Sequence, residues 1–197
     1  MWGSWRLVAV MAGGVAAGCG RYRPPLPPEA LAPQAVESLQ VTGTTGGVRL
    51  TWAAPEKDRR GKELQEIEGY SIQRKEIKRR GDETDPSVDF DDIGFVKDTH
   101  VEVREQMRAK AREEGKIGRT VKPPEELTLF SFSDTTAATG STYVYQVVPE
   151  NQGGVEGRIL EVAKVVFKGD RSDIIIVPAG DVDANADPLA KKPIGDQ

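Results

Sequence analysis

Hydrophobic and polar residues alternate over several short stretches of the chain. Val48, Leu50 and Trp52 alternate with Arg49 and Thr51, which is the period-two pattern of a strand that buries one face. The same kind of pattern, bounded by Gly, Pro and Asn turns, marks further strands at Val36, Leu39 and Val41; Ile67, Tyr70 and Ile72; Phe130 and Phe132; Tyr143, Tyr145 and Val147; Ile159 to Phe167; and Asp173 to Val177. The last of these is an extra strand or a continuation of the one before it. The chain is therefore predicted to be all-β.

A different pattern interrupts the strands between residues 97 and 126. It follows a short strand predicted from Phe90 to Val96, and residues 101–114 are rich in good helix formers, with Gly115 to end the helix. Val103, Met107 and Ala111 form a narrow apolar stripe. This stripe either packs on the sheets or contacts a partner. Packing is the stronger expectation, because a helix this charged needs tertiary contacts to persist.

Residues 33–167 resemble a fibronectin type III domain. The residues that carry the resemblance are Pro33, Leu39, Val48, Leu50, Trp52, Pro55, Ile67, Gly69, Tyr70, Asp134, Gly140, Tyr143, Tyr145, Val147, Asn151 and Gly154. The resemblance implies an immunoglobulin-like sandwich with a core of Trp52, Tyr70, Tyr143 and Tyr145, in which Tyr143 forms the tyrosine corner. The insertion at about 97–126 is the main departure, because the family does not need it.

The first residues have the layout of a secretory signal. Arg6 precedes an apolar run from Leu7 to Ala17. This run is far shorter than the roughly 20 residues that a membrane-spanning helix requires. Residues 1–18 are therefore predicted to be a signal peptide.

Ala16-Ala17-Gly18-Cys19 resembles the lipobox of bacterial lipoproteins, although leucine is commoner at the position of Ala16. The resemblance implies a covalent lipid on Cys19, the only cysteine, and two or three acyl chains would anchor the protein in a membrane. Gly20, in place of an aspartate, implies sorting to the outer membrane, on its periplasmic or surface face. The alternative is an ordinary cleaved signal followed by a stray cysteine.

Residues 19–32 are predicted to be a proline-rich linker in a polyproline II conformation. Their start is similar to that of small lipoproteins that assist the lipopolysaccharide translocon, on the residues Cys19, Gly20, Arg21, Pro24, Pro25, Leu26, Pro27 and Pro28. At the other end, residues 168–197 are predicted to contain the extra strand and a disordered tail.

Composition and motifs argue against several kinds of site. The net charge is −4, and it becomes −5 without residues 1–18, whose only charge is Arg6; no basic face for nucleic acid is evident. The single histidine, His100, lies in a charged stretch and is expected to be solvated. It has no cysteine nucleophile to activate and no second histidine with which to bind a metal. Arg80-Gly81-Asp82, the acidic stretch from Asp82 to Asp92 and the incomplete calcium-loop pattern from Asp181 to Asp187 are attributed to chance or to solvated loops.

These observations predict a protein that is not an enzyme and has no cofactor beyond the lipid on Cys19. The expected function is protein–protein interaction in the cell envelope, with an unidentified envelope partner and no small-molecule substrate. Val103, Met107 and Ala111 are the candidate partner contacts. Two alternatives stay open: an accessory subunit of an outer-membrane assembly or transport machine, and a carbohydrate-binding accessory module.

Overall fold

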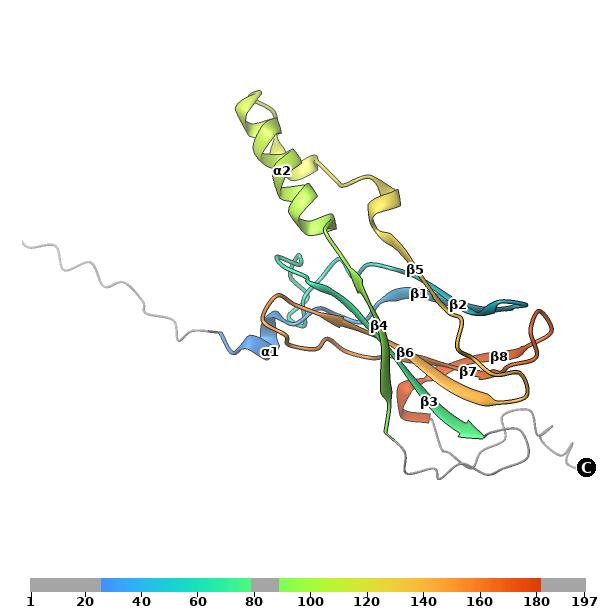
Figure 1. Cartoon of the computed structure of the whole chain (residues 1–197). Helices are drawn as coiled ribbons and strands as arrows, with labels where there is room; N and C mark the ends of the chain where they lie inside the picture. Colours follow the sequence, from blue (N-terminus) through green and yellow to red (C-terminus); the bar gives the residue numbers. More distant parts are fainter. Residues whose placement is uncertain (1–25, 79–88, 182–197) are drawn as a thin grey trace, which may run out of the picture.

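The computed structural model describes residues 26–78 and 89–181, which form two antiparallel sheets packed face to face (Figure 1). The smaller sheet has the order β1-β2-β5, and the larger has the order β4-β3-β6-β7-β8. The strands are β1 (Glu37–Thr44), β2 (Gly47–Ala53), β3 (Gly69–Lys78), β4 (Asp91–Lys97), β5 (Leu129–Asp134), β6 (Thr142–Glu150), β7 (Glu161–Val166) and β8 (Asp173–Pro178). The predicted all-β sandwich with a helical insertion is thus confirmed. The predicted signal peptide lies outside the described residues.

Aromatic side chains from both sheets meet in the core. Trp52 of β2 packs edge-on against Tyr70 of β3, with ring centroids 5.3 Å apart, and Phe130 of β5 lies 4.9 Å from the Tyr70 ring. Trp52, Tyr70, Tyr143 and Tyr145 are all at most 3% exposed. The alternating residues of β2, β3 and β6 therefore place their apolar members between the two sheets, as a strand with one buried face requires.

Asp134, at the end of β5, joins the two sheets through a polar cluster. Its Oδ2 accepts hydrogen bonds from the Tyr145 hydroxyl at 2.8 Å and from Arg74 Nη1 at 2.6 Å. Burial opposes the ionisation of Asp134, but hydrogen bonds from Thr136, Tyr145 and Arg74 outweigh it and hold the pKa of this carboxyl below its usual value. The carboxylate therefore remains charged and fixes β5 against the larger sheet.

Tyr143 ties β6 to the connection that precedes it. Its hydroxyl accepts a hydrogen bond from the Ala138 backbone N–H at 3.0 Å, which is the backbone contact expected of a tyrosine corner. The Arg74 guanidinium lies 4.9 Å from the Tyr143 ring centroid, a cation–π distance.

The start of the described chain packs on the sandwich. α1 (Pro28–Leu31) is a single helical turn, and Ala32 behind it is fully buried. The Arg59 N–H donates to the Ala32 carbonyl at 2.9 Å, and Gln34 N–H donates to the Lys57 carbonyl at the same distance. Residues 28–32 are therefore not part of a free polyproline linker, and the prediction of a linker that extends to residue 32 was wrong. The burial of Ala32 and its backbone hydrogen bond with Arg59 are not visible in a proline count.

β8 is a separate strand that pairs with β7 along its whole length, from Glu161 opposite Pro178 to Val166 opposite Asp173. The turn between these strands packs against the end of β1, where a Cβ on Gly43 would collide with the Gly169 carbonyl. None of the described helices is long and apolar enough to span a bilayer.

Candidate functional site

The insertion forms a helical arm that projects from one end of the sandwich (Figure 1). The arm consists of α2 (His100–Glu113) and two 3-10 turns, η1 (Gly118–Thr120) and η2 (Glu125–Leu127), between β4 and β5. The Asp98 carboxylate accepts the His100 N–H at 2.8 Å and so satisfies one of the free backbone donors in the first turn of α2. Gly115 adopts a φ of 72° and ends the helix, with a hydrogen bond of 2.8 Å from Lys116 N–H to the Ala111 carbonyl.

A buried polar cluster fixes the base of the arm. The Tyr70 hydroxyl donates to Asp98 Oδ2 at 2.6 Å, and the His100 ring contacts both Asp98 oxygens through Nδ1 at 2.8 Å. Asp98 is 1% exposed and His100 is 4% exposed. This geometry requires a proton on Nδ1. The prediction that His100 is solvated was wrong: the ring is buried, and its partner is Asp98, which follows β4 and also accepts the hydroxyl of Tyr70 from β3.

Tyr70 is held as a proton donor in this cluster. Burial of its hydroxyl, reinforced by the charge and the hydrogen bond of Asp98, raises the Tyr70 pKa far above its usual range. The hydroxyl therefore stays protonated through the pH range in which an exposed tyrosine ionises. The role of the cluster is to connect β3 to the arm.

Two arginines extend this connection along α2. Arg104 is 5% exposed, and its Nη2 donates to the Leu64 carbonyl at 2.5 Å. Arg108 binds Glu63 with both nitrogens, Nη1 to Oε2 at 3.0 Å and Nη2 to Oε1 at 2.7 Å. The hydrogen bond from Arg108 lowers the pKa of Glu63 against the opposing effect of burial, with help from the charge of Arg104. The arm is thus held against residues 63–64 by planar, charge-assisted contacts.

The inward face of α2 differs from the predicted apolar stripe. The buried residues of α2 are His100, Val101, Arg104 and Ala111. Two of these four, His100 and Arg104, are polar. Ala111 is 5% exposed and is not available to a partner, whereas Met107 is 36% exposed and Val103 is half-buried. The predicted contact therefore narrows to Val103 and Met107. The spacing of Arg104 and Arg108, four residues apart, was the sequence signal for the inward face, but it does not reveal the acceptors at residues 63 and 64.

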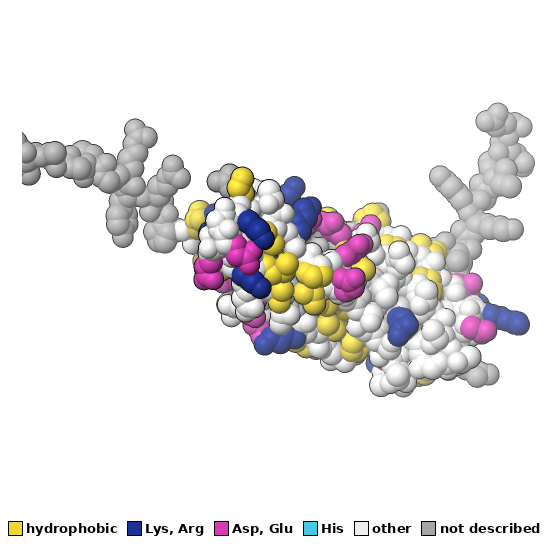
Figure 2. Space-filling view, turned by 90° about the horizontal axis from the view of Figure 1, so that it is seen from above, with side chains coloured by type: hydrophobic (Ala, Val, Ile, Leu, Met, Phe, Trp, Pro, Cys, Tyr) yellow, Lys and Arg dark blue, Asp and Glu magenta, His cyan; other side chains and the backbone are white. Residues whose placement is uncertain are grey.

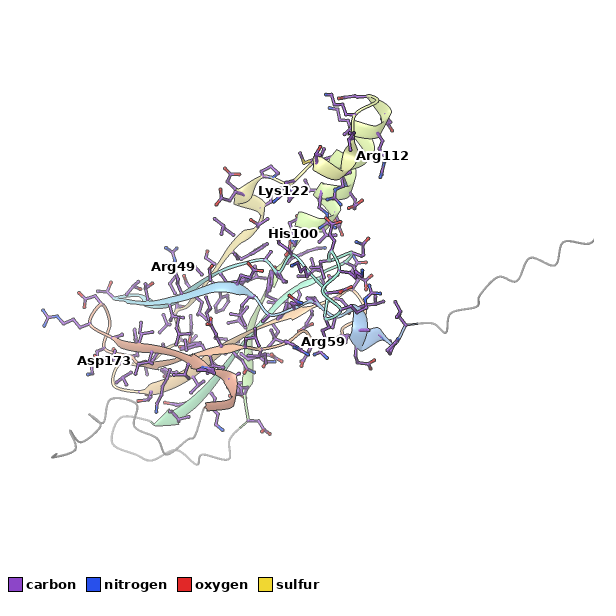
Figure 3. All side chains as sticks on the ribbon, turned by 180° about the vertical axis from the view of Figure 1, so that it is seen from behind. Arg49, Arg59, His100, Arg112, Lys122 and Asp173 are labelled. Carbon is purple, nitrogen blue, oxygen red and sulfur yellow. The ribbon has the colours of Figure 1, made fainter. Side chains whose placement is uncertain are left out.

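The arm and the end of the sandwich enclose a cleft of about 640 Å³. Figure 3 shows His100 at the base of the arm and Lys122 further up, on the connection between η1 and η2. The charged side chains of the lining are four acids and four bases, namely Glu37, Glu56, Glu63, Glu125, Lys57, Arg104, Arg108 and Lys122. No group of three or more His, Cys, Asp or Glu in residues 26–78 and 89–181 could hold a metal ion. Three of these charges, those of Glu63, Arg104 and Arg108, are paired with one another within the lining.

Beyond its base the arm carries apolar side chains on a charged surface. Met107 lies on α2, and Ile117, which is 75% exposed, lies in the turn between α2 and η1. Figure 2, viewed onto the arm, shows hydrophobic side chains flanked by groups of Lys, Arg, Asp and Glu. Apolar side chains inside a polar rim are typical of the centre of a contact surface.

The other positions singled out in the sequence lie elsewhere. Cys19 and Arg80-Gly81-Asp82 are outside the described residues, as is the calcium-loop pattern after Asp181. Trp52 Nε1 is buried and makes no hydrogen bond within the described part of the chain, so Trp52 contributes through packing alone.

No protein-family model matches the chain, and a search of curated proteins finds no similar sequence. Among solved structures, the chain is similar to the twitchin kinase region of C. elegans (Fn31-NL-kin-CRD-Ig26), with 15% sequence identity and a TM-score of 0.41. The alignment covers 71% of this chain and 17% of that one. The assignment of the sandwich rests on the strand order and register of its two sheets.

Proposed function

We propose that this chain is a membrane-tethered protein-interaction module of the cell envelope whose contact surface is the helical arm. The observation that carries the proposal is the contrast between the base of the arm and its surface. The base is held by Asp98, His100 and Arg104, all at most 5% exposed. Met107 and Ile117 remain in contact with solvent further along.

Contacts that fix the base of the arm favour recognition of a partner by its surface. Association costs conformational entropy when a surface is ordered only upon binding, and a helix that is already held in place avoids much of this cost. Buried polar groups contribute little net stability compared with an apolar contact, so their value here is a defined position for α2. Exposed apolar residues such as Met107 and Ile117 then supply the energetic centre of the contact.

The tether is the second part of the proposal. It is supported by the lipobox-like Ala16-Ala17-Gly18-Cys19 and by Gly20, which favours the outer membrane over retention. Pro28 follows Cys19 by nine positions and begins the turn that packs on the sandwich. Nine residues reach at most about 30 Å, so a lipid on Cys19 would keep the arm close to the membrane surface and to envelope partners there.

The contact surface is tested with Met107→Asp and Ile117→Asp, which place charges on the arm and leave its base intact. Partners are captured in living cells with a photo-crosslinking residue placed at Val103 in each background. We expect one specific cross-linked species in the unchanged protein and its loss in both variants. Leu160→Asp, a matched change at an apolar residue that is 61% exposed outside the arm, should leave that species in place. Persistence of the species in Met107→Asp would rule out the arm as the contact surface.

The tether is tested with Cys19→Ala. The unchanged protein should incorporate labelled palmitate and fractionate with the outer membrane, whereas the variant should lose the label and accumulate as the uncleaved precursor. Normal cleavage and unchanged fractionation of Cys19→Ala would contradict lipid attachment without affecting the proposal for the arm.

A further inference from the structure

The larger sheet ends in a strand whose outer edge is open. β8 pairs with β7 on one side, from Asp173 to Pro178. Within residues 26–78 and 89–181, no backbone hydrogen bond is made by residues 174–177 on the other side. Open edges present unpaired N–H and C=O groups that can pair with another strand, so proteins usually block them.

The edge of β4, at the opposite end of the same sheet, is blocked. It carries Asp91, Asp92 and Lys97, and the register of its pairing with β3 shifts beside Gln73. The ring of Phe132 from β5 packs so closely on Gly94 that a Cβ at this position would collide with it. Charge and irregular register protect this edge.

The edge of β1 in the smaller sheet is blocked as well. Its register shifts between Glu37 and Gln40, and Ser38 within this shift has a φ of 54°. A non-glycine residue in this conformation interrupts the extended backbone. The strand cannot offer a regular row of donors and acceptors there.

Asp173 and Pro178 stand at the two ends of β8, and within the described part of the chain residues 174–177 between them have none of these protections. These central residues are Ile174-Ile175-Ile176-Val177, which are all β-branched and uncharged, and the pairing of β8 with β7 is regular. The charge of Asp173 is already paired with Lys168 of the same hairpin, with 2.6 Å between Nζ and Oδ2. Ile176 lies on the core-facing side, opposite the buried Ala163, yet is 38% exposed at the rim of the sandwich. The strand therefore presents a regular, apolar and electrically neutral edge.

We infer that β8 pairs with β8 of a second copy of this chain, in antiparallel orientation about a two-fold axis perpendicular to the sheet. Such an axis keeps the outer face of each sheet on the same side and continues the larger sheet from one copy into the other. A pairing centred on Ile176 places the two exposed isoleucines opposite each other. Ile175 and Val177 of each copy then meet apolar residues of the other.

A second copy fits this edge because the strand is complementary to itself. In the pairing centred on Ile176, Asp173 of each copy lies opposite Ala179 of the other. The two Asp173 side chains are then separated by six residues, or about 20 Å along the strands. No like charges face each other, and the apolar, β-branched residues form the cross-strand pairs that stabilise a sheet.

The pairing is tested in the full chain by cross-linking and by mass. Ile176→Cys, treated with a short bismaleimide, should give a band of twice the chain mass on a denaturing gel. Ile117→Cys, at the more exposed position on the arm, and the unchanged chain with its native Cys19 should give none. A copy-to-copy band from Ile117→Cys that is as strong as that from Ile176→Cys, or the absence of a band from Ile176→Cys, would overturn the inference. A cross-link from Ile176→Cys to a different protein alone would also overturn it, in favour of a foreign strand on this edge.

Sedimentation in detergent provides the second measurement. The unchanged chain should sediment as two copies, and Ile176→Lys should sediment as one while it retains the circular dichroism of the folded sandwich. Ile117→Lys should remain a pair. A single copy in the unchanged chain, or a pair that survives in folded Ile176→Lys, contradicts the pairing. Neither result bears on the role of the arm.

Discussion

The sandwich and its arm are stabilised mainly by different kinds of interaction. The sandwich is stabilised by apolar and aromatic packing of Trp52, Tyr70 and Phe130, whose rings are at most 6.1 Å apart. The arm is stabilised by hydrogen bonds and ion pairs of Asp98 and Arg108. Apolar burial is non-directional and scales with area, whereas polar contacts depend on geometry and on both partners being present.

This difference indicates different roles. The sandwich tolerates conservative apolar changes because its stability is spread over many contacts. The arm depends on a few polar contacts and on Val101, the residue of α2 that belongs to the hydrophobic core. A surface for recognition depends more on the fixed position of its residues than on the global stability of the protein. The three changes below separate the two regions.

Trp52→Ala should have the largest effect. It removes the indole, which is 2% exposed at the centre of the core, and large-to-small changes of this kind cost about 3–5 kcal/mol of the free energy of unfolding. The measurement is chemical denaturation followed by circular dichroism. Trp52→Phe keeps an aromatic ring and should lose much less. Equal stability of the Trp52→Ala variant and the unchanged protein would refute the placement of Trp52 in the core.

Asp98→Ala should have an intermediate effect that is concentrated in the arm. It leaves the Tyr70 hydroxyl and the His100 N–H without an acceptor, and each unsatisfied buried group costs about 1–3 kcal/mol. Hydrogen exchange should show lost protection over residues 100–113, together with a moderate fall in global stability. Asp98→Asn keeps an acceptor oxygen and should retain more of the protection. Unchanged exchange of α2 in Asp98→Ala would show that the cluster does not hold the arm.

Glu63→Gln should have the smallest effect. The Glu63 side chain is 49% exposed, and exposed ion pairs contribute about 0.2–1 kcal/mol and weaken in salt. Faster hydrogen exchange in the middle of α2, around Arg104 and Arg108, and less sensitivity of this exchange to salt, are the expected results. Glu113→Gln makes the same change of charge at the last residue of α2 and should alter neither quantity. An equal effect of the two variants would show that the exchange of α2 responds to net charge and not to the Arg108–Glu63 contact.

The ion pair between Arg108 and Glu63 also makes the stability of the arm depend on pH. Because the pKa of Glu63 is lower in the folded protein than its ordinary value of 4.5, the folded state binds this proton more weakly than the unfolded state does. The Arg108–Glu63 contact therefore stabilises fully above pH 4.5 and is lost as the pH falls through the folded pKa. The protection factors of the α2 amides, which correct for the intrinsic pH dependence of exchange, should be constant near neutral pH and fall only below this value. Glu63→Gln should reduce the fall.

The local sequence by itself determines some elements of the fold, such as β2 and α2. The period-two alternation around Val48, Leu50 and Trp52 predicts a strand with one buried face, because the geometry of a strand places every second side chain on the same side. The good helix formers before Gly115 likewise predict α2 to within one residue at each end. These signals lie within the segment that they describe.

Tertiary structure alone decided the features that make the arm a site. His100 is buried because Tyr70, 30 positions earlier in the chain, shares Asp98 with it. Arg108 faces inward because Glu63 accepts its hydrogen bonds from 45 positions away. Ala32 and Gln34, at and just after the end of a segment that by composition is a plain linker, are held in place by residues 59 and 57. A polar or short segment is buried or exposed according to whether distant groups satisfy its hydrogen bonds, and no local pattern records those partners.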